Sequence, residues 1–155
     1  MSRRRGVIAL SLAAAGSMGL IALYQSGLIR HIPEPPLPRL DADKVDASAE
    51  AFERLEVGDA FLGFVSYGVT MTLAAMGSPD RAMRQPWIPL ALAGKVAFDV
   101  GMAAKLTVDQ WTKHKAFCFW CLVAATATFA AAPLVVGETR RALATLATNR
   151  KHLTA

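Results

Sequence analysis

Residues 116–137 read AFCFWCLVAATATFAAAPLVVG, a continuous apolar stretch that begins at the two cysteines of the chain and contains no charged side chain. A helix needs about 20 predominantly apolar residues to cross the hydrocarbon core of a bilayer. Three further windows come close to this requirement, at 6–24, 58–76 and 87–108. The chain has 155 residues, and 54% of them are hydrophobic, more than a soluble domain normally carries. The sequence therefore predicts four membrane-spanning helices.

The predicted fold is an all-α integral membrane protein in which four transmembrane helices form a bundle. Residues 1–155 form one domain, because no stretch is left for a separate soluble unit. A long outer loop, 25–57, joins the first two helices, and its part 41–56 is compatible with a short surface helix. A cytoplasmic tail, 138–155, follows the fourth helix. The first window is also compatible with a secretory signal, but its length and the lack of a clean cleavage site favour an uncleaved anchor.

The distribution of basic residues predicts the orientation. Three arginines precede the first window, Arg81 and Arg84 lie between the second and third windows, and the tail is basic, whereas the outer loop is net acidic. Because short cytoplasmic loops are enriched in Lys and Arg, both termini are expected in the cytoplasm. Lys113 and Lys115 go against this pattern. The net charge of +5 is explained by the same rule and by contact of the tail with membrane lipid, so no nucleic-acid partner is expected.

Cys118 and Cys121 have C-x-x-C spacing. This spacing suits a single reversible disulfide, since it keeps two thiols within bonding distance of each other. Two cysteines are too few for a structural zinc site, and His114 would add only a third ligand, so no metal is expected. The predicted orientation places the pair at the outer mouth of the fourth helix, where disulfides persist. The motif therefore indicates a redox site.

Three further side chains are candidates for a proton or electrostatic role. Lys95 and Asp99 lie four residues apart in the third window, so they share one helix face and can pair. Such a pair inside a membrane serves either a proton path or a structural salt bridge, and both interpretations stay open. His114 lies near Cys118, where it can favour a thiolate or relay a proton. Ordinary interfacial charge is the alternative for His114.

The cysteine motif that opens the fourth window resembles the vitamin K epoxide reductase family. Residues 57–67, VGDAFLGFVSY, resemble the entry to the second helix of that family, and the likeness extends over roughly 44–132. It implies a four-helix quinone reductase that passes electrons from thiols to a quinone, either ubiquinone or menaquinone. It further implies a multi-pass protein of the bacterial inner membrane with a periplasmic thioredoxin-like thiol partner, supporting disulfide formation.

The resemblance also implies roles for individual residues. Cys121 would face the quinone, and Cys118 would be the more exposed cysteine that exchanges disulfides with the partner. Asp59 corresponds to the position of an amide that hydrogen-bonds the quinone in the family. Phe117 and Trp120 are candidates for contact with the quinone ring, although an aromatic belt at the membrane interface explains them equally well.

The sequence departs from the family in the outer loop, which lacks the pair of shuttle cysteines. The matching region, 43–50, reads DKVDASAE, with Ala47 near the expected cysteine and Ser48 retained, and Ala125 replaces a tyrosine of the fourth helix. An internal thiol relay is therefore impossible, so that a partner thiol would have to reach Cys118 directly. Two hypotheses follow. The chain is a redox enzyme, alone or with a partner that supplies the missing thiols, or it is a non-catalytic scaffold subunit of a larger membrane complex.

Overall fold

The computed structural model describes residues 2–46 and 58–153. Ala47, Ser48 and most of the predicted surface helix at 41–56 lie outside the described residues. In chain order, the elements are α1 (Ser2–Gln25), α2 (Ala42–Asp46), α3 (Asp59–Ala75), α4 (Arg81–Arg84), α5 (Trp87–Asp109), the π-helical turn η2 (Gln110–His114) and α6 (Phe119–Leu153). The described part of the chain contains no strand, which confirms the all-α class.

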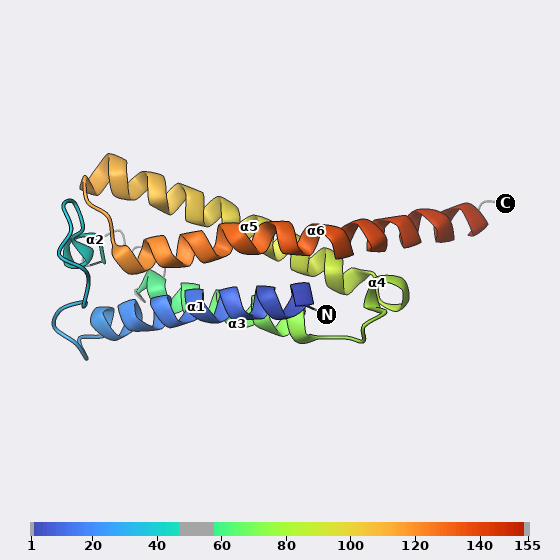
Figure 1. Ribbon diagram of the computed structural model, residues 1–155, viewed down its shortest axis with the longest axis horizontal. Helices are drawn as coiled ribbons and strands as arrows, with labels where there is room; N and C mark the ends of the chain where they lie inside the picture. The colour runs from blue at the N-terminus through green and yellow to red at the C-terminus, as the bar shows by residue number, and fades with distance from the viewer. Residues whose placement is uncertain (1, 47–57, 154–155) are drawn as a thin grey trace.

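The four longer helices, α1, α3, α5 and α6, pack side by side along one direction (Figure 1). Helix α1 lies against both α3 and α6, and α5 packs mainly on α6. Helix α6 continues as a helix through Pro133 and runs past the ends of the other helices (Figure 1). Residues 138–153 therefore extend the last helix, where the sequence analysis expected only a tail.

Three helical segments are long and apolar enough to cross a membrane, at Ser2–Gln25, Trp87–His114 and Phe119–Asn149. The structure therefore has three candidate membrane-spanning helices, as expected of a membrane protein. Helix α3 is also apolar but has 17 residues, below the length at which a straight crossing is expected. That α3 forms a fourth crossing stays a prediction.

Small side chains bring the helices close together. Ala14 of α1 packs with Ala124 and Ala127 of α6 in one buried cluster. Where α1 meets α3, a Cβ atom on Gly63 would lie only 3.0 Å from the sulfur of Met18. Small residues at such contacts allow helices to approach closely in a membrane, where burial of apolar surface does not by itself drive helix association.

A buried arginine joins three helices at the end of the bundle that carries the N-terminus. Arg81 of α4 is 0% exposed and forms two 2.7 Å hydrogen bonds with the carboxylate of Glu138 in α6. It also donates to the carbonyl oxygens of Leu73 (2.7 Å) and Met76 (2.6 Å) at the end of α3. These are carbonyls that a helix leaves without an intrahelical partner. Arg81 therefore both pairs with a carboxylate and caps a helix.

A second arginine supports the same helix end. Arg4 of α1 donates to the carbonyl oxygens of Ala74, Ala75 and Met76, each at 2.9 Å. Together, Arg4 and Arg81 connect α1, α4 and α6 to the last turn of α3. This end of the bundle is thus held by charged hydrogen bonds as well as by apolar packing.

Replacement of Arg81 by methionine is expected to destabilise the protein by about 3 kcal/mol or more, because it leaves the partly buried carboxylate of Glu138 and the carbonyl of Leu73 without the guanidinium donor. Thermal unfolding of the purified protein in detergent measures this effect. Arg84→Met is the matched control, since Arg84 belongs to the same helix and is exposed. Equal melting temperatures for the two variants would contradict the role given to Arg81.

Candidate active site at the cysteine pair

The cysteine pair lies at the first turn of α6. Cys118 immediately precedes the helix, and its sulfur accepts a hydrogen bond from the backbone N–H of Cys121 at 3.2 Å. Its own N–H donates to Oε1 of Gln110 at 3.1 Å, which ties the pair to η2. Both cysteines are free thiols. The Cys118 sulfur thus lies at the positive end of a helix dipole, a position that favours negative charge.

The first loop folds over this pair. The backbone N–H of Asp41 donates to the carbonyl of Phe117 at 3.0 Å, and the N–H of Phe117 donates to the carbonyl of Arg39 at 2.8 Å. The indole N–H of Trp120 donates to the carbonyl of Pro33 at 2.7 Å. We call residues 31–46 the strap, because they cross the start of α6 and are held there by these bonds.

The strap determines the exposure of the two thiols. Cys118 is 0% exposed, whereas Cys121 is partly exposed. The prediction that Cys118 is the more exposed cysteine is therefore wrong. The physical reason is that the strap packs on Cys118, with Ile32, Ala42 and Val45 in the same buried cluster.

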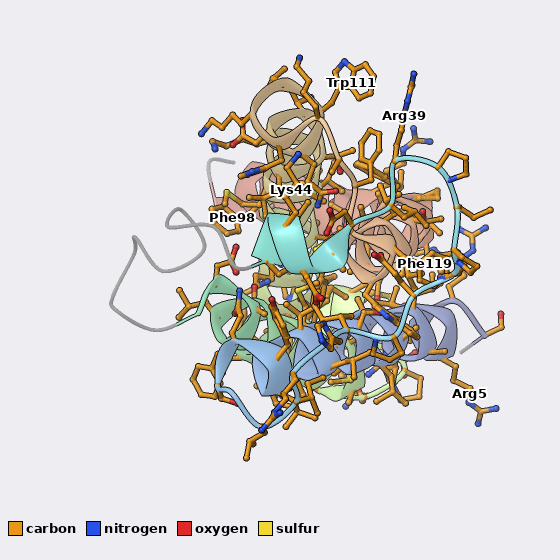
Figure 2. The ribbon with its side chains drawn as sticks, turned by 90° about the vertical axis from the view of Figure 1, so that its left-hand side faces the viewer. Arg5, Arg39, Lys44, Phe98, Trp111 and Phe119 are labelled. Carbon is orange, nitrogen blue, oxygen red and sulfur yellow. The ribbon has the colours of Figure 1, made fainter. Side chains whose placement is uncertain are left out.

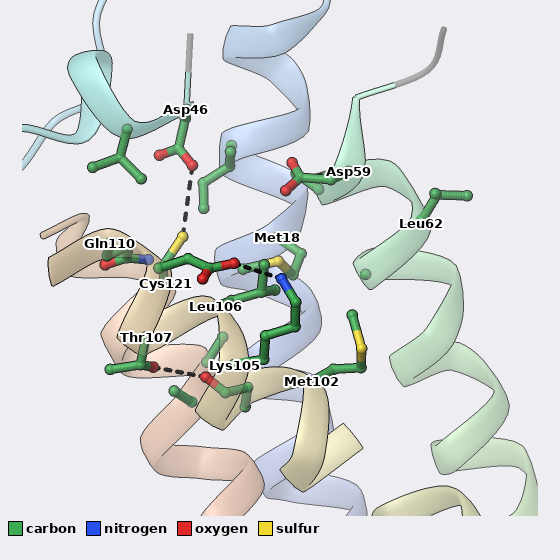
Figure 3. Close-up of a pocket in the computed structure, with 18 of the residues that line it drawn as sticks. Met18, Asp46, Asp59, Leu62, Met102, Lys105, Leu106, Thr107, Gln110 and Cys121 are labelled. Atoms are coloured by element: carbon green, nitrogen blue, oxygen red, sulfur yellow. Dashed lines mark hydrogen bonds and ion pairs between the residues drawn. The ribbon is translucent and has the colours of Figure 1, made fainter. Parts of the chain in front are cut away.

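The strap also brings a carboxyl group to the thiols. Asp46, the last residue of α2, is 5% exposed, and its Oδ1 accepts a hydrogen bond from the Cys121 thiol at 3.6 Å (Figure 3). The carboxyl oxygen of Asp46 and the sulfurs of Cys118 and Cys121 all lie within 4.8 Å of one another. The other oxygen, Oδ2, is buried and has no hydrogen-bond partner among the described residues. Asp46 was not among the predicted site residues, although it lies in the region matched to the shuttle cysteines.

Burial raises the pKa of Asp46 from its usual 3.8 to about 7. The nearby carboxylates of Asp59 and Glu34 contribute to the rise, while hydrogen bonds from the Cys118 and Cys121 thiols act in the opposite direction. Desolvation dominates because a carboxylate loses its hydration when it is buried. The carboxyl group at the cysteine pair therefore changes its protonation state near neutral pH.

A cavity of about 450 Å³ opens between the helices next to the pair. Figure 3 shows Cys121 and Asp46 at one end of it and Asp59 across from them, on α3. Asp99 and His114 also line this cavity. This one cavity is thus lined by four of the residues predicted from the sequence, namely Cys121, Asp59, Asp99 and His114.

Asp59 is positioned by a glutamine of α1. Gln25 donates from Nε2 to Oδ1 of Asp59 at 2.9 Å and accepts from the N–H of Ala60 at 3.2 Å. The same Nε2 lies 3.3 Å from the carbonyl oxygen of Asp46. Gln25 therefore connects the ends of α1 and α3 to the strap and holds Asp59 at the cavity.

Lys95 and Asp99 form a compact polar network between α5 and α3. Lys95 Nζ lies 2.6 and 2.7 Å from the two carboxylate oxygens of Asp99, and 2.7 Å from the hydroxyl of Ser66. The hydroxyl of Thr70 donates to Asp99 at 3.1 Å. These bonds support the structural interpretation of the pair, and a proton path through it stays a prediction.

Phe117 and Trp120 hold the strap and are not among the residues that line the cavity. Phe117 stacks on Trp111 with 5.8 Å between the ring centroids, and Arg39 lies over the ring of Trp111 (Figure 2). The indole N–H of Trp120 contacts the strap carbonyl described above. Contact of either ring with a quinone is untested, and so is the expected absence of a metal.

Comparison with known proteins identifies the family. The model of the vitamin K epoxide reductase family matches residues 6–136, which is most of the chain and covers most of α1, all of α3 and α5, and the first half of α6. No curated protein shows a significant match to the chain.

The raised pKa of Asp46 predicts a pH-dependent stability. Between its usual pKa of 3.8 and about 7, the folded protein holds a proton that the unfolded chain has lost, so stability falls as the pH rises through this range. One pKa unit corresponds to about 1.4 kcal/mol, so the expected fall is about 4 kcal/mol over the whole range and about 3 kcal/mol of it above pH 5. Thermal or denaturant unfolding between about pH 5 and pH 8 measures it.

Asp46→Asn should remove most of this pH dependence, because the amide does not titrate. The exposed Asp41 provides the matched control as Asp41→Asn, which changes the same charge on the same strap and should retain the fall. A wild type whose stability is constant over the range, or rises, would contradict the prediction.

Proposed function

Since the chain belongs to the vitamin K epoxide reductase family, we propose that it is a membrane thiol–disulfide oxidoreductase that passes electrons from an external thiol protein through Cys118 and Cys121 to a quinone. Membership of the family supports the coarse activity, since the family comprises membrane oxidoreductases linked to quinones. The single observation that supports the finer assignment is the position of Cys121. Its thiol lies at the wall of a 450 Å³ cavity and within 4.8 Å of the only other thiol of the chain.

The cavity has the properties that a quinone site needs. Apolar residues of α3 and α5 line it, among them Leu62, Met102 and Leu106, and its volume lies in the range of small-molecule sites. Phe98 and Leu106 line it and are also exposed on the surface of α5. A lipid-soluble substrate would therefore enter from the side of the bundle. Asp59 would face its polar end and, when protonated, would donate a hydrogen bond to a quinone oxygen.

The proposed reaction balances without an internal relay. A thiolate of the partner attacks Cys118 of the oxidised pair, the Cys118–Cys121 bond breaks, and Cys121 leaves as a thiolate that takes up a proton. The second thiol of the partner then displaces Cys118 from the mixed disulfide. The partner is oxidised to a disulfide, and the pair becomes a dithiol. Re-formation of the Cys118–Cys121 bond sends two electrons and two protons to the quinone, which becomes a quinol.

The burial of Cys118 adds one requirement. Because the strap covers Cys118, the partner would have to displace part of residues 31–46 before its thiolate could attack. We propose a thioredoxin-like thiol protein as this partner, since such proteins present one reactive thiolate at their surface.

The proposed location is the bacterial inner membrane. In this arrangement, α3 completes the four-helix transmembrane bundle, both termini are cytoplasmic, and the cysteine pair lies on the outer side. The basic residues near the N-terminus and in α4 support this orientation, because they gather at the end of the bundle opposite the cysteines.

A second candidate function is a non-catalytic subunit that retains the bundle as a scaffold within a larger membrane complex. The observation that favours it is the complete burial of Cys118 in a chain without loop cysteines. The two candidates differ in whether the cysteine pair cycles between dithiol and disulfide.

Quinone-dependent oxidation of the pair tests the proposal. The reduced protein in detergent is mixed with a soluble ubiquinone or menaquinone analogue, and maleimide labelling followed by mass spectrometry counts the free thiols. The wild type should lose both thiols as the quinone is reduced, and Cys121→Ser should not reduce the quinone at all.

Thr126→Val is the control for the cysteine variant, since Thr126 is exposed one turn further along α6. It should oxidise at the wild-type rate. A wild-type pair that stays reduced with every quinone offered would contradict the redox function and favour the scaffold.

A further inference from the structure

We propose that Asp46 is the proton-exchanging group of the cysteine pair, and this inference rests on the redox function proposed above. Its carboxyl group donates a proton to the Cys121 thiolate when the disulfide opens and accepts it again when the disulfide forms. The first loop of this chain, which lacks the shuttle cysteines of the family, thereby supplies a proton donor to the cysteine pair instead.

The geometry carries this assignment. The Cys121 thiol and Oδ1 of Asp46 are already hydrogen-bonded at 3.6 Å, an ordinary distance for a bond that involves sulfur. No atom has to move far for the proton to pass between them. Asp46 is also the only carboxyl residue that groups with both sulfurs within 4.8 Å among the described residues.

Burial of the Asp46 carboxyl group favours its protonated form, which can donate a proton to Cys121. At 5% exposure the Asp46 carboxyl group is shielded from water, and it is hydrogen-bonded to the Cys121 sulfur, so its proton can pass directly to a thiolate released there. The second oxygen, Oδ2, is buried without a hydrogen-bond partner in the described part of the chain. A neutral carboxylic acid satisfies such a site better than a carboxylate, since an unpaired buried charge is costly.

The charged and titratable groups around Asp46 lie on the strap, α1, α3, α5 and η2, and the group on α1 is the phenol of Tyr24. Two acidic groups, Glu34 of the strap and Asp59 of α3, disfavour its ionisation. The remaining charged and titratable groups that line the same cavity are the phenol of Tyr67 on α3 and five residues of α5 and η2, namely Asp99, Lys105, Asp109, Lys113 and His114. Of these, Lys105 is bound to Asp109, and Lys113 lies 3.8 Å from the same carboxylate. The lysines are therefore engaged with Asp109.

The proton and electron balance is complete. During opening, the thiolate of the reductant forms a bond to Cys118, the electrons of the broken S–S bond go to Cys121, and the proton of Asp46 follows them to the sulfur. This leaves a mixed disulfide on Cys118, a Cys121 thiol and an Asp46 carboxylate, and the second thiol of the reductant then displaces Cys118 and supplies its proton. During re-formation, Asp46 takes the proton from Cys121, the two sulfurs bond, and two electrons and the two thiol protons pass to the quinone of the proposed reaction.

The test uses disulfide opening by dithiothreitol, which needs no quinone. The full-length oxidised protein in detergent is reduced at a series of pH values, and each rate constant is divided by the thiolate fraction of the reagent. In the wild type, this corrected rate constant should be highest where Asp46 is protonated and fall as Asp46 ionises, at about pH 7 or above, because the disulfide lacks the thiol hydrogen bonds that lower the pKa of Asp46 in the reduced protein. The expected fall is about a hundredfold, the low end of the range for general acid catalysis.

In Asp46→Asn, the corrected rate constant should stay at all pH values at the low level that the wild type reaches at high pH. In Asp46→Glu, the fall of the corrected rate constant with pH should return. Asp41→Asn is the matched control and should retain the wild-type profile. A wild-type profile without an inflection would overturn the proposal even if the asparagine variant did not fold, and so would an asparagine variant with the wild-type profile.

The two proposals fail separately. A normal inflection in dithiothreitol reduction combined with no quinone reduction would overturn the quinone function and leave the proton exchange at Asp46 supported. Quinone reduction combined with a flat wild-type profile would overturn the assignment of Asp46 alone.

Discussion

Two backbone hydrogen bonds, between Asp41 and Phe117 and between Phe117 and Arg39, fix the strap against the start of α6. Everything distinctive about the cysteine pair depends on this attachment. It buries Cys118, leaves Cys121 at the cavity, and delivers the carboxyl group of Asp46 to the sulfurs. A C-x-x-C motif at an uncovered helix end would present its first sulfur to solvent and would have no such acid beside it.

At the opposite end of the bundle, two arginines fix the end of α3. There the guanidinium groups of Arg4 and Arg81 cap the last turn of α3 and connect it to α1 and α6. This arrangement fixes α3 at one end, while Gln25 fixes its other end beside the cavity. The short helix that carries Asp59 is therefore held in register with α1 at both ends, and the cavity between α3, α5 and α6 keeps a defined wall.

Much of the fold could be predicted from the sequence, because apolar composition over about 20 residues is a local property of the chain. The family resemblance pointed to Cys121 and Asp59, and closeness to Cys118 in the sequence pointed to His114, and all three line one cavity. The burial of Cys118 and the place of Asp46 did not. Both depend on hydrogen bonds between segments far apart in the chain, such as that between Trp120 and the carbonyl of Pro33, which no local pattern reveals.

The central claim is that a strap carboxyl group at the reduced cysteine pair gains and loses its proton close to neutral pH. Infrared difference spectroscopy of the reduced protein, recorded as the pH is raised, tests it most directly through the C=O stretching band of a protonated carboxylic acid. The account predicts a band that disappears with a midpoint at about pH 7 and that is missing in Asp46→Asn. A spectrum in which no such band titrates above the usual range of aspartate would contradict it.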